Sequence, residues 1–103
     1  SLNGNILAVG DYVVDTVSVF EWSSTTSTWN QKGSTITSVA GLSVSLSNDG
    51  LILALGDQNY DSNRGRGQVY EWSGADWVQK GSDILGKFTG DLCGGTVYLS
   101  GDV

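Results

Sequence analysis

Four oxygen-bearing side chains at alternate positions form the most suggestive chemical pattern in the sequence. They are Asp57, Asn59, Asp61 and Asn63. Alternate spacing turns successive carboxylate and amide oxygens towards one point, and calcium binds such oxygens. The pattern therefore predicts a calcium loop, with calcium as the only cofactor that the residues suggest. A second interpretation stays open, in which this is a solvated surface loop whose acids are offset by Arg64 and Arg66.

Two aromatic side chains are the candidate ligand-binding residues. Tyr60 lies inside the same loop, and Trp77 stands where a predicted strand leaves a turn. Exposed aromatic rings stack on sugar rings or anchor a protein partner. Another interpretation is that Trp77 fills space between packed sheets, because Trp29 occupies the corresponding position in the first half of the chain.

Groups that usually perform catalysis are scarce. The chain has no His, which removes the commonest general base and metal ligand together. Its single cysteine, Cys93, has no His to activate it and no second cysteine for a disulfide within the chain. Neither a nucleophile elbow nor a phosphate-binding loop occurs. We therefore predict that the chain is not an enzyme. The alternative from that class is a glycan hydrolase or lyase that uses paired carboxylates.

Charge and hydropathy exclude further classes of protein. The 103 residues carry 5 basic and 11 acidic side chains, a formal net charge of −6. Nucleic-acid binding requires clustered Lys and Arg, so no nucleic-acid partner is expected. No apolar stretch approaches the roughly 20 residues that a transmembrane helix needs. Because the chain begins with Ser1 and shows no secretory signal, we interpret it as a mature or excised segment.

The elements that position these residues follow from an internal repeat. Four stretches recur about 50 residues apart, which is typical of a repeated supersecondary unit. They are NGNILAVGD (3–11) and DGLILALGD (49–57), VSVFEW (17–22) and GQVYEW (67–72), WNQKGSTI (29–36) and WVQKGSDI (77–84), and GLSVSLSND (41–49) and GGTVYLSGD (94–102). We divide the chain accordingly into a first unit at 1–44, whose first strand is truncated, a second at 45–97, and the start of a third at 98–103.

Each unit is predicted to hold four short antiparallel strands. In the second unit they cover 42–47, 51–55, 68–72 and 77–80. The first of them alternates polar and apolar residues, the second is apolar throughout, and no stretch has a helical period. Four strands in about 50 residues form one blade of a β-propeller. The predicted fold is therefore all-β, with two four-stranded blades that belong to a larger propeller or one completed by oligomerisation.

The repeated stretches resemble a known family. GLSVSLSNDGLILALGD, followed by GQVYEW, resembles the FG-GAP repeat of integrin-α-like β-propellers. This resemblance implies an extracellular or cell-surface structural or adhesive module that binds protein or glycan. Repeats of the family often hold calcium between their first two strands, but the corresponding residues 47–50 are too few to surround an ion, so that site is not carried over.

Two further expectations complete the interpretation. SNDGLILALGD with VYEW is also similar to a WD repeat, which leaves an intracellular scaffold as an alternative, although the Gly-His pair of that family is absent. Known propellers close with about 4–8 blades, so two blades do not close alone. Either the chain is part of a longer polypeptide, or self-assembly of several copies completes the ring.

The calcium loop gives the first testable prediction. We expect titration with calcium to release saturable heat, and Asp61→Asn to weaken binding about tenfold because one ligand carboxylate is lost. Isothermal titration calorimetry measures both. Asp15→Asn, in the corresponding first-unit loop that lacks the pattern, is the matched control and should bind like the parent. Absence of heat at about millimolar calcium contradicts the prediction and supports the solvated-loop interpretation.

Overall fold

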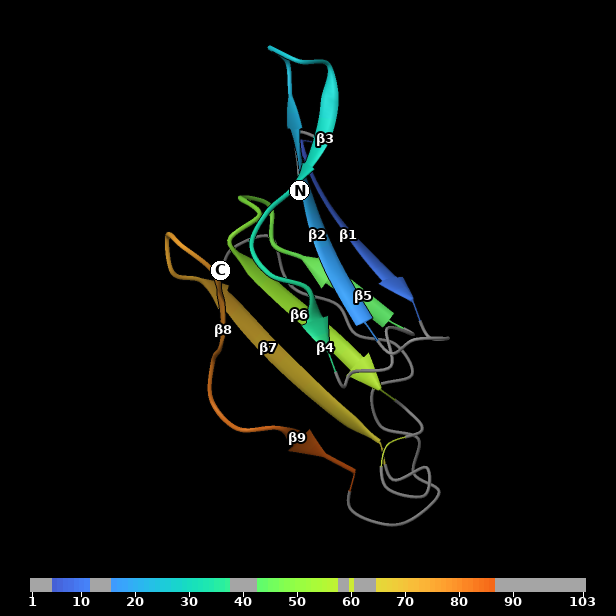
Figure 1. The fold of residues 1–103 in the computed structure, drawn as a ribbon. Coiled ribbons are helices and arrows are strands. Elements are labelled where there is room, and N and C mark those ends of the chain that lie inside the picture. The colour runs from blue at the N-terminus through green and yellow to red at the C-terminus, as the bar shows by residue number, and fades with distance from the viewer. Residues whose placement is uncertain (1–4, 12–15, 38–42, 58–59, 61–64, 87–103) are drawn as a thin grey trace.

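A computed structural model of the chain describes residues 5–11, 16–37, 43–57, 60 and 65–86, and it is all-β, as predicted (Figure 1). Its regular elements within these ranges are nine strands. They are β1 (Ile6–Asp11), β2 (Thr16–Ser23), β3 (Thr28–Gln31), β4 (Ile36–Thr37), β5 (Ser43–Leu46), β6 (Ile52–Asp57), β7 (Arg66–Trp72), β8 (Trp77–Gln79) and β9 (Ile84–Leu85).

The strands form two antiparallel sheets. The first sheet has the order β1-β2-β3, with β4 paired to the other end of β2. The second has the order β5-β6-β7-β8, with β9 paired to β7. All four strands predicted for the second unit are present, whereas β4 and β9 were missed because two residues are too few to show alternation. Over the described residues neither sheet closes on itself, so the propeller stays a prediction.

The two sheets pair corresponding residues in the same way. Trp22 faces Trp29 across β2 and β3, and Trp72 faces Trp77 across β7 and β8. Each pair of rings meets edge to face, with centroids 5.4 Å apart in the first sheet and 5.3 Å in the second. This geometry suits the quadrupoles of two aromatic rings, and it fixes the register of each hairpin.

The hydrophobic core lies where one face of the first sheet covers one face of the second, as the two layers in Figure 1 show. Its buried members come equally from both sheets: Val17, Val19, Ile36, Leu53, Leu55 and Trp77. Strand β6 is buried over most of its length, as its apolar sequence predicted. Full burial of a leucine side chain contributes roughly 1.5–3 kcal/mol, so this contact holds the layers together.

A tight turn at Lys32, Gly33 and Ser34, which we name the docking turn, extends from the first sheet and forms hydrogen bonds with the second. The indole nitrogen of Trp77 donates a hydrogen bond to the Lys32 carbonyl at 2.9 Å. The Ser34 amide and hydroxyl donate to the two oxygens of Asp76 at 2.8 and 2.9 Å. Gly33 has φ +79°, and a Cβ there would lie 2.8 Å from Asp76 Oδ1. Both the backbone and the space therefore require glycine.

A pair of glycine substitutions separates these two requirements. Gly81 has nearly the same φ, +78°, but a Cβ there meets nothing within 4 Å. We expect Gly81→Ala to lower the free energy of unfolding by about 1 kcal/mol through backbone strain alone. Gly33→Ala should lower it by about 3 kcal/mol because the added methyl group also pushes the sheets apart. Chemical denaturation in dilute solution measures both, and equal losses would show that the docking turn does not hold the layers.

Candidate functional site

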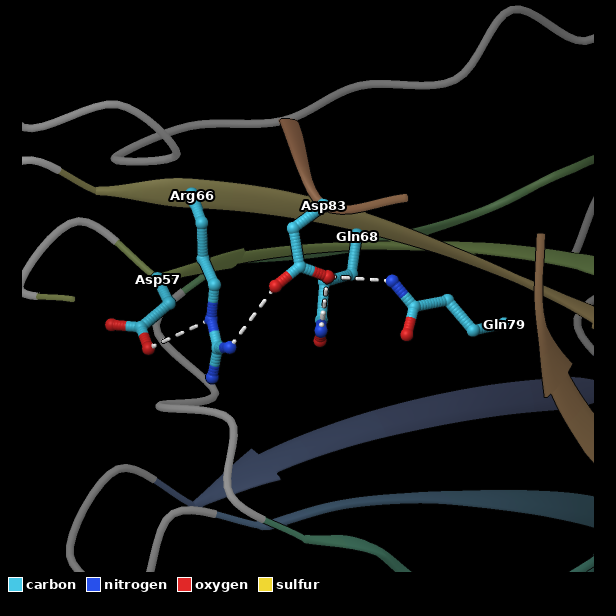
Figure 2. Close-up of polar contacts among 5 residues, drawn as sticks. All are labelled: Asp57, Arg66, Gln68, Gln79 and Asp83. Carbon is cyan, nitrogen blue, oxygen red and sulfur yellow. Dashed lines mark hydrogen bonds and ion pairs between the residues drawn. The ribbon is translucent and has the colours of Figure 1, made fainter. Parts of the chain in front are cut away.

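Five polar side chains meet at one end of the second sheet, and we name them the polar cluster (Figure 2). They are Asp57, Arg66, Gln68, Gln79 and Asp83. Asp57 ends β6 and is the direct cross-strand partner of Arg66, which begins β7. Gln68 lies two residues further along β7 and so shares a face with Arg66. Gln79 ends β8, and Asp83 precedes β9.

Asp83 is the acceptor at the centre of the polar cluster. Its Oδ1 accepts hydrogen bonds from Gln68 Nε2 at 2.8 Å and from Gln79 Nε2 at 2.6 Å. Its Oδ2 lies 3.3 Å from Arg66 Nη1, and Arg66 Nε lies 3.6 Å from Asp57 Oδ2. The guanidinium thus sits between two carboxylates, and three strands are tied to the segment that leads into β9 (Figure 2).

The electrostatics of the polar cluster favour a charged carboxylate. Hydrogen bonds from Gln68 and then Gln79 lower the pKa of Asp83, helped by Arg66 and opposed by partial burial. Asp83 is therefore ionised near neutral pH and accepts hydrogen bonds instead of donating a proton. Burial, followed by the negative charge of Asp83, raises the pKa of Tyr70 above its usual 10.0, so that phenol stays protonated.

The predicted calcium ligands are only partly within the described residues. Asp57 is buried and paired with Arg66, while Asn59, Asp61 and Asn63 lie outside the described ranges. Among the residues with described positions, no three His, Cys, Asp or Glu gather closely enough to hold a metal ion. The calcium loop stays a prediction.

The two aromatic candidates occupy different surroundings. Tyr60 is exposed, and the Arg66 guanidinium carbon lies 4.0 Å from its ring centroid, so a cation covers one face of the ring. Trp77 is buried between the sheets, where its indole bonds to the docking turn. The ring of Trp77 therefore packs the interior, in agreement with the gap-filling interpretation.

The exposed aromatic surface lies instead on the first sheet, and we name it the aromatic face. Its members are exposed apolar side chains on one side of β1, β2 and β3: Leu7, Val9, Trp22 and Trp29. They correspond in sequence to residues that are covered in the second sheet. Sequence reasoning missed this surface because equivalent residues look alike, and only the order in which the sheets pack shows which copy is uncovered.

Comparison with known proteins adds no assignment. No protein-family model, no curated protein and no solved structure matches this chain. Within the described ranges no helix has the length and apolar character to cross a membrane.

The lowered pKa of Asp83 predicts the pH dependence of stability. The folded pKa of Asp83 lies below the usual aspartate value of 3.8, so its stabilisation is present above that value and is lost as pH falls through the folded pKa. At neutral pH, Asp83→Asn should lower the free energy of unfolding by about 1–2 kcal/mol, because the hydrogen bonds lose a charged acceptor. Once the pH falls below the folded pKa of Asp83, the parent and the variant should converge, because Asp83 is then protonated.

Denaturant titrations at several pH values measure this difference. Glu71→Gln is the control, because that carboxylate is exposed and pairs with exposed Lys80, so its removal should cost less than about 0.5 kcal/mol. A gap between parent and Asp83→Asn that stays constant down to acid pH contradicts an ionised Asp83 as the centre of the polar cluster.

Proposed function

We propose that this chain is a non-catalytic, β-propeller-type binding module of an extracellular or cell-surface protein, and that it binds a protein or a glycan through the aromatic face. The observation that carries the proposal is the exposure of Leu7, Val9, Trp22 and Trp29 side by side on one sheet. Contiguous exposed apolar side chains mark interaction surfaces in soluble proteins. Tryptophan is enriched among the residues that dominate binding energy.

The propeller part of the proposal is supported by how the sheets stack. A four-stranded sheet cannot bury both faces alone, and here one face of each sheet covers the other. The extracellular location and the adhesive role are supported by the resemblance of GLSVSLSNDGLILALGD and GQVYEW to FG-GAP repeats. Corresponding tryptophan pairs in both sheets agree with an internal repeat.

Binding is favoured over hydrolysis by the state of three described carboxyl groups. A glycosidase needs one carboxylic acid whose pKa is raised, so that it can protonate the leaving group. Asp49, Asp76 and Asp83 all have a lowered pKa. In Asp76 the largest cause is the hydrogen bond from the Ser34 amide, and in Asp49 it is the Ser47 hydroxyl. These groups are acceptors at neutral pH and suit a structural role.

A glycan array and a parallel hydrolysis screen on the whole chain test this function. We expect retention of ligand without turnover, and Trp29→Ala should weaken binding at least about tenfold because an exposed anchoring ring is removed. Glu21→Gln, at an exposed site on the opposite side of β2, is the matched control and should bind like the parent. Turnover of a glycan that disappears when one carboxylate is replaced overturns the proposal. So does binding of glycans and proteins that is indifferent to Trp29→Ala.

A further inference from the structure

The contact between the two sheets has two halves, a turn and the surface that receives it. A second copy of each half lies outside that contact, one on each sheet. Inside the chain, the docking turn at 32–34 meets Trp77 and Asp76 of the second sheet. The second unit carries its own copy of that turn, and the first sheet carries its own copy of the surface that receives it. Both copies are exposed.

The exposed turn is Lys80, Gly81 and Ser82, and its backbone matches that of the docking turn. The Lys80 amide donates to the Val69 carbonyl at 2.6 Å, as the Lys32 amide donates to the Val19 carbonyl at 2.7 Å. Gly81 has φ +78°, against +79° for Gly33. The surroundings differ, however, because the Lys32 side chain is 12% exposed and the Lys80 side chain 60%.

The exposed receiving surface is the aromatic face. Trp29 is 43% exposed, whereas the corresponding Trp77 is 7% exposed. Leu7 is 47% exposed, whereas the corresponding Leu53 is fully buried. Among the described residues, no hydrogen bond reaches the Trp29 indole, whereas the Trp77 indole is bonded to the docking turn. Among the described residues, a layer covers the second sheet and none covers the corresponding face of the first, which accounts for the difference.

We propose that a second copy of this chain docks head-to-tail on the aromatic face, inserting its 80–82 turn where the docking turn inserts within the chain. The indole of Trp29 then donates to the Lys80 carbonyl of the second copy, as Trp77 donates to Lys32. The Lys80 ammonium of that copy lies over the Trp22 ring, as Lys32 Nζ lies 4.8 Å from the Trp72 ring centroid. The inference rests on the proposed function and names its protein partner.

Each copy offers one turn and one aromatic face, so the contact is heterologous and repeats from copy to copy. A ring forms if the rotation between copies closes. Two blades per chain would need about two to four copies to reach the 4–8 blades of known propellers.

One substitution in the sequence makes the contact between copies weaker than the contact within the chain. Asp76 accepts two hydrogen bonds from Ser34. The corresponding residue of the first sheet is Thr28, which directly precedes Trp29 as Asp76 precedes Trp77 and faces Ser23 across the hairpin. A threonine hydroxyl cannot replace a carboxylate that accepts from both an amide and a hydroxyl. Thr28→Asp should therefore tighten association about tenfold.

Sedimentation velocity and light scattering on the whole chain test the inference. We expect the mean molar mass to rise above 10.8 kDa with concentration. Gly81→Ala and Trp29→Ala should each weaken association at least about tenfold, because one half of the contact is blocked or lost. Gly74→Ala is the matched control, since Gly74 also has positive φ, +100°, with nothing within 4 Å of a Cβ, but lies outside the contact. It should associate like the parent.

Mixing the two defective variants distinguishes head-to-tail docking from every symmetric contact. Gly81→Ala keeps an intact aromatic face, and Trp29→Ala keeps an intact 80–82 turn. An equimolar mixture should form one-to-one dimers that stop at two copies, whereas either variant alone stays monomeric. Dimerisation of the mixture also shows that both variants are folded.

Three results overturn the inference. The first is a parent chain that stays monomeric up to about 0.5 mM, because association would then be too weak for a specific interface. The second is an equal loss of association in Gly81→Ala and Gly74→Ala, and the third is a mixture that does not dimerise although both variants show native circular dichroism. A monomeric chain that still binds a glycan through Trp29 overturns self-docking alone and leaves the proposed function standing. Catalytic turnover overturns the proposed function alone.

Discussion

The structure depends on one constraint, which is that a short antiparallel sheet has two faces and can bury neither by itself. Leu53 and Leu55 are fully covered only because Val17 and Val19 of the other sheet lie over them. Around this apolar contact, polar groups form hydrogen bonds from one layer to the other. The docking turn, for instance, gives its amide and carbonyl to the second sheet. The register of both hairpins serves the same contact, because a slip of one residue would turn every leucine to the wrong face.

The polar cluster has a neutral counterpart in the first sheet, which clarifies its role. At the corresponding positions, Gln31 Nε2 donates to Thr35 Oγ1 at 2.8 Å, and Ser18 Oγ lies 3.2 Å from the same oxygen. Both arrangements tie the segment that leads into a two-residue strand to the sheet beside it. The second sheet performs this with a charged acceptor, Asp83, and adds Arg66. The position is therefore structural in both sheets, and the charge is the feature particular to one of them.

The sequence contained enough information for the longer strands, but not for the two-residue strands β4 and β9 or for the surfaces. Strands β5 to β8 follow from alternation, from the apolar run in β6 and from the turn at 48–50, where the Gly50 amide donates to the Ser47 carbonyl at 3.0 Å. These are local properties, and neighbours a few residues away decide them. The polar cluster was missed because Gln68, Gln79 and Asp83 are brought together only by cross-strand pairing. The number of blades depends on contacts beyond two sheets, so no local pattern determines it.

Trp29 and Trp77 show why chemistry at the surface cannot be assigned from residue type alone. Both follow a hairpin turn, and both pair with a second tryptophan in the same geometry. In both cases the same Gln-Lys-Gly-Ser sequence begins two residues later. One is interior and the other is exposed because, within the described part of the chain, a sheet packs over Trp77 and none packs over Trp29. The surface that covers Trp77 within the chain, including the docking turn, therefore has the shape and the hydrogen-bonding groups that also fit Trp29. For this chain, the interior contact between the sheets is the most direct description of what its exposed aromatic face is built to bind.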